Sequence, residues 1–440
     1  MLGQEFLMRF NRSLILAAVS LAALVSAQGG AQAGGFALRE QSATGQGASF
    51  AGVAAGSAGV SSMYWNPATI TMAPGWQSEF HGTAIIPESK VTPLYTIPAG
   101  LAALGPSGDI GLDAVIASSY TSYQINDQLW VGFYSGAPFG LVTKPNPTWA
   151  GQLYARTTSV FSFEAMPTVA YKVNDWLSIG AGVRAQYFKV RYFSATAATP
   201  FAPSAGLEGD NWGFGYSLGA TLTPFAGTSI GIGFRSAVEQ KLDGSFQHFG
   251  IPIKANLMLP ESVSVGLSQR ITDAFTLNAS AEWTNWSRLG FPRVTNALTG
   301  GFLASSPYLP LDYKDGWFFS VGGEYRVNPA WTLRAGLGYE IAPIDLENRN
   351  PRLPDSDRVW LSVGTTYNWS DQLSFDLAYT HIFSVGNTDI NIAPGNPIFP
   401  TRGIVFAADV DSQVDIISAS VKYRWDNPAK AIPAPIVRKY

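Results

Sequence analysis

The pentapeptide GTSIG at 227–231 has the spacing of a serine-hydrolase nucleophile motif, G-x-S-x-G. In enzymes that use this motif, the serine lies on a sharp turn between a strand and a helix, and a histidine acts as its base. Here the pentapeptide follows a turn and opens an alternating, strand-like segment. We therefore interpret it as the glycine-rich start of a strand.

Other residue types that do chemistry are scarce. The chain has no cysteine, which excludes disulfides, thiolate catalysis, iron–sulfur clusters and thiolate zinc sites. Its histidines are His81, His248 and His381, too few for a multi-histidine metal centre. The two histidines on predicted strands have no patterned serine beside them, and no glycine-rich phosphate loop precedes a helix. We expect no catalytic residue, no metal and no cofactor, and we do not predict an enzyme.

The composition points away from an ordinary soluble domain. Only 13% of the residues are Asp, Glu, Lys or Arg, against about 25% in typical soluble domains. The formal charge of −3 leaves no polybasic surface for nucleic acid. A hydrophobic content of 46% excludes a disordered chain. The composition fits either an unusual soluble β protein or a membrane-spanning barrel.

Residues 1–33 are predicted to be a secretory signal peptide. Two arginines precede an apolar run at 14–27, and AQA at 31–33 supplies a small-x-small cleavage pattern. The run is shorter than the about 20 residues that a spanning helix needs, which disfavours an uncleaved anchor. We expect cleavage after the AQA motif, with VSA at 25–27 as a second candidate site. No later stretch is long and apolar enough to predict a spanning helix.

Several later segments alternate strictly between apolar and polar residues, a pattern typical of strands with two different faces. The clearest are 212–222, 275–283, 331–340 and 417–425. They run to about ten residues, which suits a tilted membrane-crossing strand better than the soluble mode of about five or six. Aromatic residues lie at both ends of the apolar face, as in interfacial girdles. The opposite face carries glycine, serine, threonine and charge, which suits a hydrated lumen.

These strands predict an all-β membrane protein, a fourteen-stranded antiparallel transmembrane β-barrel over residues 76–425. A bilayer admits only structures whose backbone polar groups are all paired, so exported strands of this kind should close into a barrel. An even strand number returns both ends of the chain to one side. Residues 34–75 lack alternation and form either a disordered leader or a plug in the lumen. Residues 426–440 contain three prolines and are predicted to be a periplasmic C-terminal extension.

The start of the mature chain resembles the FadL family of outer-membrane fatty-acid transporters. The resemblance begins with GGFALREQSATGQG at 34–47 and YWNPAT at 64–69. Further matches follow in family order: INDQ at 125–128, NWGFG at 211–215, FRS at 234–236, LPE at 259–261, WTNWS at 283–287 and PDSDR at 354–358. The chain departs from the family at its end, where it continues for 15 residues past the aromatic residue at which the last strand usually stops.

The resemblance implies a passive uptake route for hydrophobic compounds. A ligand would land on apolar extracellular loops, pass to a pocket above an N-terminal hatch (residues 34–75) and leave sideways at a kink in the third strand. Segments 196–207 and 249–259 are predicted to be such loops, because they are more apolar than surface loops should be. Packing of one loop on another is the alternative explanation.

The lateral exit is predicted at Gly136, Ala137, Pro138, Phe139 and Gly140. Proline cannot donate to a strand ladder, and glycine weakens one, so this stretch should interrupt the predicted strand 129–140. A simple bulge would give the same pattern.

The resemblance also assigns roles to single residues. It makes Phe36 a ligand-pocket residue and Asn66, Pro67 and Ala68 the hatch motif, which we expect to fix the conformation of the plug. It places Glu340 near the ligand route.

Alternation predicts a set of charges pointing into the lumen: Arg184, Arg235, Glu239, Glu282, Glu324, Arg326, Arg334 and Glu340. A fatty carboxylate favours arginine or lysine, so we expect Arg184 and Arg235 to contact the head group. The alternative for each of these residues is an ordinary lumen charge in a hydrated ion-pair network. Lys189 and Arg191 match basic, ligand-binding positions of the family, whereas alternation puts them on the outer face, and the sequence leaves that conflict open.

The predicted function is passive transport of long-chain fatty acids or similar hydrophobic compounds across the outer membrane. The alternatives are uptake of aromatic hydrocarbons, and a surface adhesin or receptor built on the same barrel. A general porin is disfavoured, because a plug of about 40 residues would block an open water channel. We expect a monomer whose partners are a hydrophobic small molecule and the surrounding outer-membrane lipid and lipopolysaccharide, with no nucleic acid.

Overall fold

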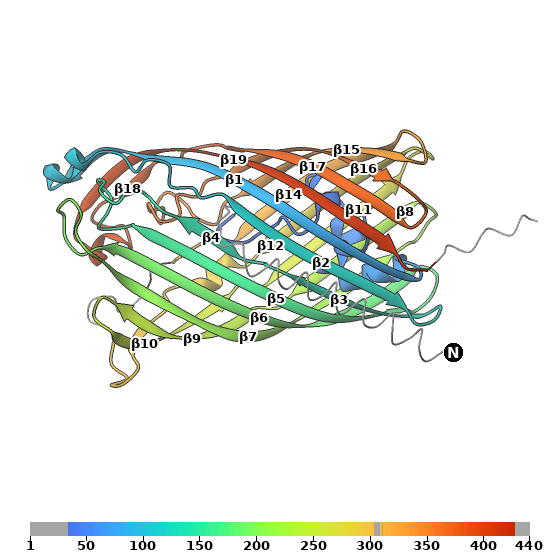
Figure 1. The fold of residues 1–440 in the computed structure, drawn as a ribbon, viewed down its shortest axis with the longest axis horizontal. Helices are drawn as coiled ribbons and strands as arrows, with labels where there is room; N and C mark the ends of the chain where they lie inside the picture. Colours follow the sequence, from blue (N-terminus) through green and yellow to red (C-terminus); the bar gives the residue numbers. More distant parts are fainter. Residues whose placement is uncertain (1–33, 303–308, 310, 427–440) are drawn as a thin grey trace, which may run out of the picture.

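The fold is a closed antiparallel β-barrel with a short N-terminal segment inside it (Figure 1). It was analysed in a computed structural model that describes residues 34–302, 309 and 311–426. The predicted signal peptide and all but the first residue of the predicted C-terminal extension lie outside these ranges. The first and last long strands pair over nearly their whole length and close the wall.

Nineteen strand segments of the described chain make up the fourteen strands. Nine strands are single segments: β1 (Trp76–Ile97), β2 (Ala114–Gln124), β5 (Thr157–Lys172), β6 (Leu177–Ala195), β7 (Ser204–Leu222), β14 (Gly316–Arg326), β15 (Trp331–Ile341), β16 (Arg358–Asn368) and β19 (Val405–Arg424). Five strands are interrupted: β3 with β4 (Leu129–Gly136, Gly140–Thr143), β8 with β9 (Thr228–Arg235, Val238–Gln247), β10 with β11 (Ile251–Leu259, Ser262–Arg270), β12 with β13 (Phe275–Thr284, Val294–Asn296) and β17 with β18 (Leu373–Ser384, Ile390–Ile392). The predicted strand number is confirmed.

The alternation read from the sequence is the alternation between lipid and lumen. Along β15, Leu333 and Leu337 are half exposed on the outside, while Gly336 and Glu340 are buried inside. Each strand pairs with a neighbour on both sides, which satisfies the backbone groups that lipid cannot. In the described ranges, no helix has the length and apolar character needed to cross a membrane.

One of the predicted inward charges is on the wrong face. The two residues between β8 and β9 interrupt the strand, so odd residues face inward before the break and even residues face inward after it. Arg235 is therefore buried in the lumen, whereas Glu239 is exposed on the outer face. Strict alternation through the break gave the wrong face for Glu239.

The prediction that 249–259 is a loop is also wrong. Most of it is β10, which pairs with β9 and turns Ile253, Leu257 and Leu259 inward. The apolar side chains of this stretch therefore belong to the interior of the barrel. The second predicted loop, 196–207, is a loop only up to the start of β7 at Ser204.

Residues 34–75, here called the N-terminal segment, lie inside the barrel (blue in Figure 1). The segment consists of one short helix and three 3-10 turns: α2 (Ala43–Gln46), η1 (Val53–Ala55), η2 (Gly59–Tyr64) and η3 (Pro67–Met72). α2 contacts β16, β17 and β19, η1 contacts β8 and β11, and η3 contacts β5, β6 and β7. Contacts on opposite sides of the wall hold the segment across the lumen. Three further 3-10 turns lie in connections: η4 (Ala99–Leu104), η5 (Trp286–Leu289) and η6 (Phe399–Thr401).

Candidate functional site

An apolar pocket surrounds Phe36 in the extracellular half of the lumen. The Phe36 ring lies 4.8 Å from Trp286, 5.7 Å from Phe139 and 6.2 Å from Phe188, measured between ring centroids. The rest of the lining comes from the inner faces of several strands and from the loops above them: Leu141, Val160, Leu242, Leu257, Tyr313 and Leu353. The free volume is about 60 Å³, because Phe36 itself fills the pocket.

The polar end of the Phe36 pocket is formed by Arg352, from the loop between β15 and β16. Its buried guanidinium donates to the Phe193 carbonyl at 2.9 Å and to the Ser194 hydroxyl at 3.0 Å, and it lies 3.5 Å from the centre of the Tyr192 ring. Burial lowers the Arg352 pKa to about 10. No carboxylate of the described chain forms an ion pair with this guanidinium.

The arginines predicted to bind a head group lie deeper, and they share one carboxylate. Arg184 pairs with Glu164 at 2.8 Å, and Arg235 pairs with the other oxygen of Glu164 at 2.5 Å. All three side chains are buried, and the Arg235 guanidinium also stacks 4.0 Å from the Tyr64 ring centre. The two arginines line a second small cavity that also contacts Pro138 and Glu340. In this structure the positive charges of Arg184 and Arg235 are therefore paired with Glu164 and are not free for a head group.

The predicted exit is a real interruption, and the N-terminal segment covers it from inside. Residues 137–139 separate β3 from β4, and we call them the β3–β4 break. The ladder between β2 and β3 ends at Ser119 and Ser135. Beyond it, β4 pairs with β5 and makes only an isolated bridge elsewhere in the described chain.

The N-terminal segment and Ser162 of β5 share the hydrogen bonds to the backbone at the β3–β4 break; Ser162 bonds to the amide and the carbonyl of Phe139. The Leu38 amide donates to the Pro138 carbonyl and the Gly140 amide donates to the Phe36 carbonyl, both at 2.9 Å. Ala37 and Phe139 face each other as an antiparallel bridge. The Gln41 side chain adds a bond of 2.8 Å to the carbonyl of Ala137.

The predicted hatch motif anchors the N-terminal segment to the wall. The Asn66 side chain accepts from the Ala68 amide at 3.0 Å, and it donates to the Ala54 and Ala220 carbonyls at 2.7 and 3.0 Å. Pro67 begins η3, where its missing N–H costs no hydrogen bond. Both residues pack on Gly219 of β7, where a Cβ would overlap the Asn66 oxygen.

Replacing Gly219 by valine should therefore loosen the N-terminal segment rather than the wall. We expect Gly219→Val to lower the free energy of unfolding by about 1–3 kcal/mol, as overpacking does, and to raise ion leakage through planar bilayers. The matched control is Gly82→Val, because a Cβ at Gly82 meets nothing within 4 Å. Equal leakage in the two variants would show that the Asn66 contact does not hold the segment.

A groove opens on the outer side of the wall next to the Phe36 pocket, and we call it the outer groove. Its volume is about 570 Å³, and it shares Ala255, Leu257 and Pro292 with the pocket. Its lining combines apolar side chains with three cations, Lys254, Arg288 and Arg293, and one acid, Glu239. Lys254 pairs with Asp243 at 3.5 Å and Arg288 pairs with Glu261, but the cations still outnumber the acid in the lining. An anionic, mostly apolar molecule matches that lining.

Lys189 and Arg191 lie on the outer face of β6, as alternation predicts. Both pair with Glu208 of β7, at 2.9 and 3.2 Å, and both remain partly exposed. The wall separates them from the Phe36 pocket.

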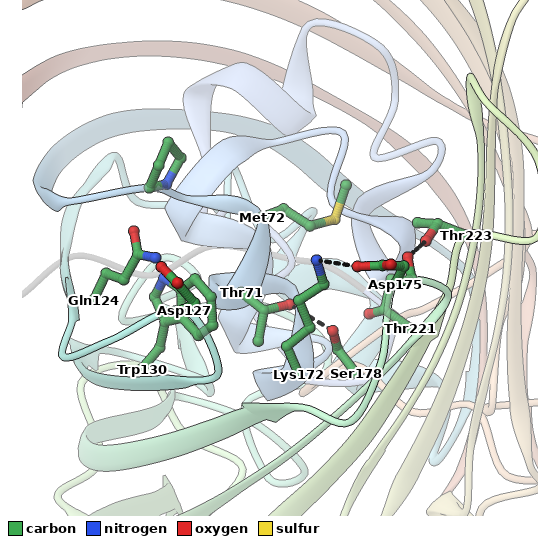
Figure 2. A pocket seen from close by; sticks show the side chains of 11 residues that line it. Thr71, Met72, Gln124, Asp127, Trp130, Lys172, Asp175, Ser178, Thr221 and Thr223 are labelled. Atoms are coloured by element: carbon green, nitrogen blue, oxygen red, sulfur yellow. Dashed lines mark hydrogen bonds and ion pairs between the residues drawn. The ribbon is translucent and has the colours of Figure 1, made fainter. Parts of the chain in front are cut away.

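At the periplasmic end, a cavity of about 430 Å³ lies between the end of the N-terminal segment and the turns of the barrel (Figure 2). Thr71 donates to Ser178 at 2.9 Å and Lys172 pairs with Asp175 at 3.1 Å. Polar groups therefore surround the periplasmic mouth, in contrast to the apolar pocket above it.

The serine of the hydrolase-like motif has a structural contact. Ser229 lies on the inner face of β8 and donates to the Ala55 carbonyl of the N-terminal segment at 2.8 Å. His81 accepts from the Ala43 amide at 3.1 Å and lies 3.2 Å from Glu79. These groups connect the wall to the N-terminal segment.

Comparison with known proteins places this architecture in a family. Residues 22–425 match the family described as "Outer membrane protein transport protein (OMPP1/FadL/TodX)". The long-chain fatty acid transport protein of Escherichia coli K12 is 27% identical, over 85% of this chain and 92% of that protein. The 47 kDa outer membrane protein of Pasteurella multocida is 26% identical, over 95% of this chain and 99% of that protein.

A solved structure shows the same fold. The crystal structure of a Pseudomonas aeruginosa FadL homologue superposes with a TM-score of 0.80 at 22% identity, over 89% of this chain and all of that one. The match to the family covers the whole barrel and the N-terminal segment. The chain therefore belongs to the OMPP1/FadL/TodX family of transport proteins and is a β-barrel of the bacterial outer membrane.

Proposed function

We propose that this chain carries long-chain fatty acids across the outer membrane by passive diffusion. The observation that supports this most directly is Arg352, whose buried guanidinium lies at the end of an apolar pocket and has no carboxylate partner among the described residues. A fatty acid offers a long apolar chain and one carboxylate, which pairs well with guanidinium. The Escherichia coli relative is a long-chain fatty acid transport protein, which supports the same substrate class.

The proposed route begins at the outer groove. Lys254 and Arg293 would attract the carboxylate, while the apolar lining accepts the chain. The residues that the groove shares with the Phe36 pocket lead the ligand inward. There Arg352 takes the head group, and the second cavity with Arg184 and Arg235 leads on toward Glu340 and the break.

The N-terminal segment would act as the hatch of this route. The Phe36 pocket is too small for a long acyl chain while Phe36 occupies it, so binding must displace that side chain. Phe36 also holds Gly140 by a backbone hydrogen bond. If the backbone of residue 36 moves with its side chain, this bond breaks and the N-terminal segment holds the β3–β4 break less firmly. The ligand would then leave sideways into the membrane between β2 and β4.

The substrate class is tested by removing the charge of Arg352. We expect Arg352→Leu to bind oleate roughly tenfold to a hundredfold more weakly, since a hydrogen bond to a charged group contributes about 1.5–3 kcal/mol. Binding of toluene, which has no charge, should change little. Both affinities can be measured by quenching of tryptophan fluorescence in detergent.

Arg191→Leu is the control, because that guanidinium lies on the outer face. Uptake of radiolabelled oleate by a transporter-deficient host tests the route as a whole. Toluene uptake without oleate uptake would favour the aromatic-hydrocarbon alternative. If neither oleate nor toluene is taken up and sugars pass rapidly into liposomes, the transporter proposal is rejected and a porin is favoured. Binding of cells or proteins without any uptake would favour an adhesin.

A further inference from the structure

A buried group of ionisable side chains surrounds the backbone of Gly34, and we call it the Glu340 cluster. Its members come from the N-terminal segment, from β12, β15 and β16, and from the loop before β16: Arg39, Glu40, Glu282, Glu340, Asp355 and Arg358. Four of them are acids and two are arginines. Apart from Arg39 and Glu282, which are slightly exposed, all are at most 4% exposed.

The two arginines are committed to two of the acids. Arg39 pairs with Glu282 at 2.7 Å and is 3.7 Å from Glu340. Arg358 pairs with Asp355 at 2.5 Å and is 3.8 Å from Glu340. Both arginines therefore reach Glu340 only at longer range than they reach their own partners, and the Trp360 indole donates to the Glu340 Oε2 atom at 3.2 Å.

Four buried acids face two arginines in this cluster, so its carboxylates outnumber its cationic side chains by two. Within the described structure, neither carboxyl oxygen of Glu40 has a hydrogen-bond partner. Burial raises the Glu40 pKa to about 7 and the Asp355 pKa to about 6. A further cation in contact with the cluster would stabilise its charged carboxylates.

The main-chain nitrogen of Gly34 occupies the place where such a cation is needed. It lies 3.1 Å from the Glu340 Oε1 atom, and the Gly35 amide lies 2.8 Å from the Asp355 Oδ2 atom. Both glycines are buried. A Cβ at Gly34 would overlap the Glu340 carboxylate, so a larger residue at this position would push that carboxylate away from the main-chain nitrogen.

We propose that signal-peptide cleavage after Ala33 makes the α-ammonium group of Gly34 the missing cation, which pairs with Glu340 and fixes the start of the N-terminal segment. A signal peptidase would hydrolyse the Ala33–Gly34 amide with one water molecule. This step leaves a carboxylate on Ala33 and an amine on Gly34, which takes up a proton. The nitrogen that donates to Glu340 as an amide thereby gains a full charge at the same contact.

The ion pair between the Gly34 amine and Glu340 would affect the Phe36 pocket by fixing the position of the residues that follow Gly34. Gly34 is two residues before Phe36, and residues 36–38 make the two backbone bonds to the β3–β4 break. Processing would therefore secure both the side chain that fills the pocket and the strand that covers the break. The inference does not depend on which compound the barrel carries.

The test uses the full-length processed protein purified from outer membranes. Intact mass should give Gly34 as the first residue. The rate of α-amine acetylation, measured against pH by peptide mass spectrometry, reports the pKa of that amine. We expect a pKa clearly above the usual value of about 7.7–8.0 in the folded protein and the usual value in urea.

Glu340→Gln should return the amine to the usual pKa in the folded protein, whereas Glu208→Gln on the outer face should not. Three results would overturn the proposal: a processed chain that begins elsewhere, such as at Gln28; an unshifted pKa in the wild-type fold; or a shift that survives Glu340→Gln. The wild-type measurement decides the matter by itself if Glu340→Gln does not fold.

Discussion

A disulfide made by Ala37→Cys and Phe139→Cys is expected to reduce oleate uptake to the background of cells that carry an empty vector, and a reductant should restore it. The two residues form an antiparallel bridge in which the neighbouring amides carry the hydrogen bonds. Opposed Cα atoms at such positions are about 4.5 Å apart, within the range for a disulfide. The bond would tie the N-terminal segment to the β3–β4 break.

The design is clean because the chain has no cysteine of its own. Each single variant in the same strain is a control, since it removes the same side chain without the covalent link. Uptake should be measured with radiolabelled oleate before and after mild reduction. If the oxidised double variant transports oleate as well as its reduced form, the exit does not lie at this break.

The largest loss of stability is expected for Glu164→Gln. The substitution keeps the shape of the side chain but leaves Arg184 and Arg235 side by side without a carboxylate. Removing one partner of a buried ion pair typically costs about 3–5 kcal/mol, because the remaining charge stays buried. Unfolding in urea, followed by tryptophan fluorescence in lipid vesicles, would measure it.

Glu208→Gln is the matched control for this prediction. It also removes a carboxylate shared by two cations, Lys189 and Arg191, but these lie on the outer face and remain partly exposed. Exposed pairs contribute about 0–1 kcal/mol. Equal losses in the two variants would mean that the lumen around Glu164 is as well hydrated as the outer surface.

The wall of the barrel was predictable because lipid imposes a strict period on the sequence. A strand that faces oil on one side and a hydrated interior on the other must alternate, so its length and its faces can be read directly. The same rule correctly predicted that Lys189 and Arg191 lie on the outer face. It failed at Glu239, where two unpaired residues change the phase of the strand.

The ligand pocket was less predictable, because it is formed by contacts between distant segments. Arg352 lies in a loop without periodicity, and only the folded chain brings it to Ser194 and the Tyr192 ring. Arg184 and Arg235 were readable as inward charges, yet their shared partner Glu164 lies on a different strand. Periodicity gives the direction of a side chain but not its partner.

The N-terminal segment has no compartment of its own until the barrel closes around it. It must stay soluble until β1 and β19 meet and create that compartment. Its run of glycine, alanine and serine at 43–62 includes few large apolar side chains, which limits sticking to chaperones or other unfinished chains. The assembly of the barrel, as well as the transport of a ligand, would therefore favour a segment rich in glycine, alanine and serine.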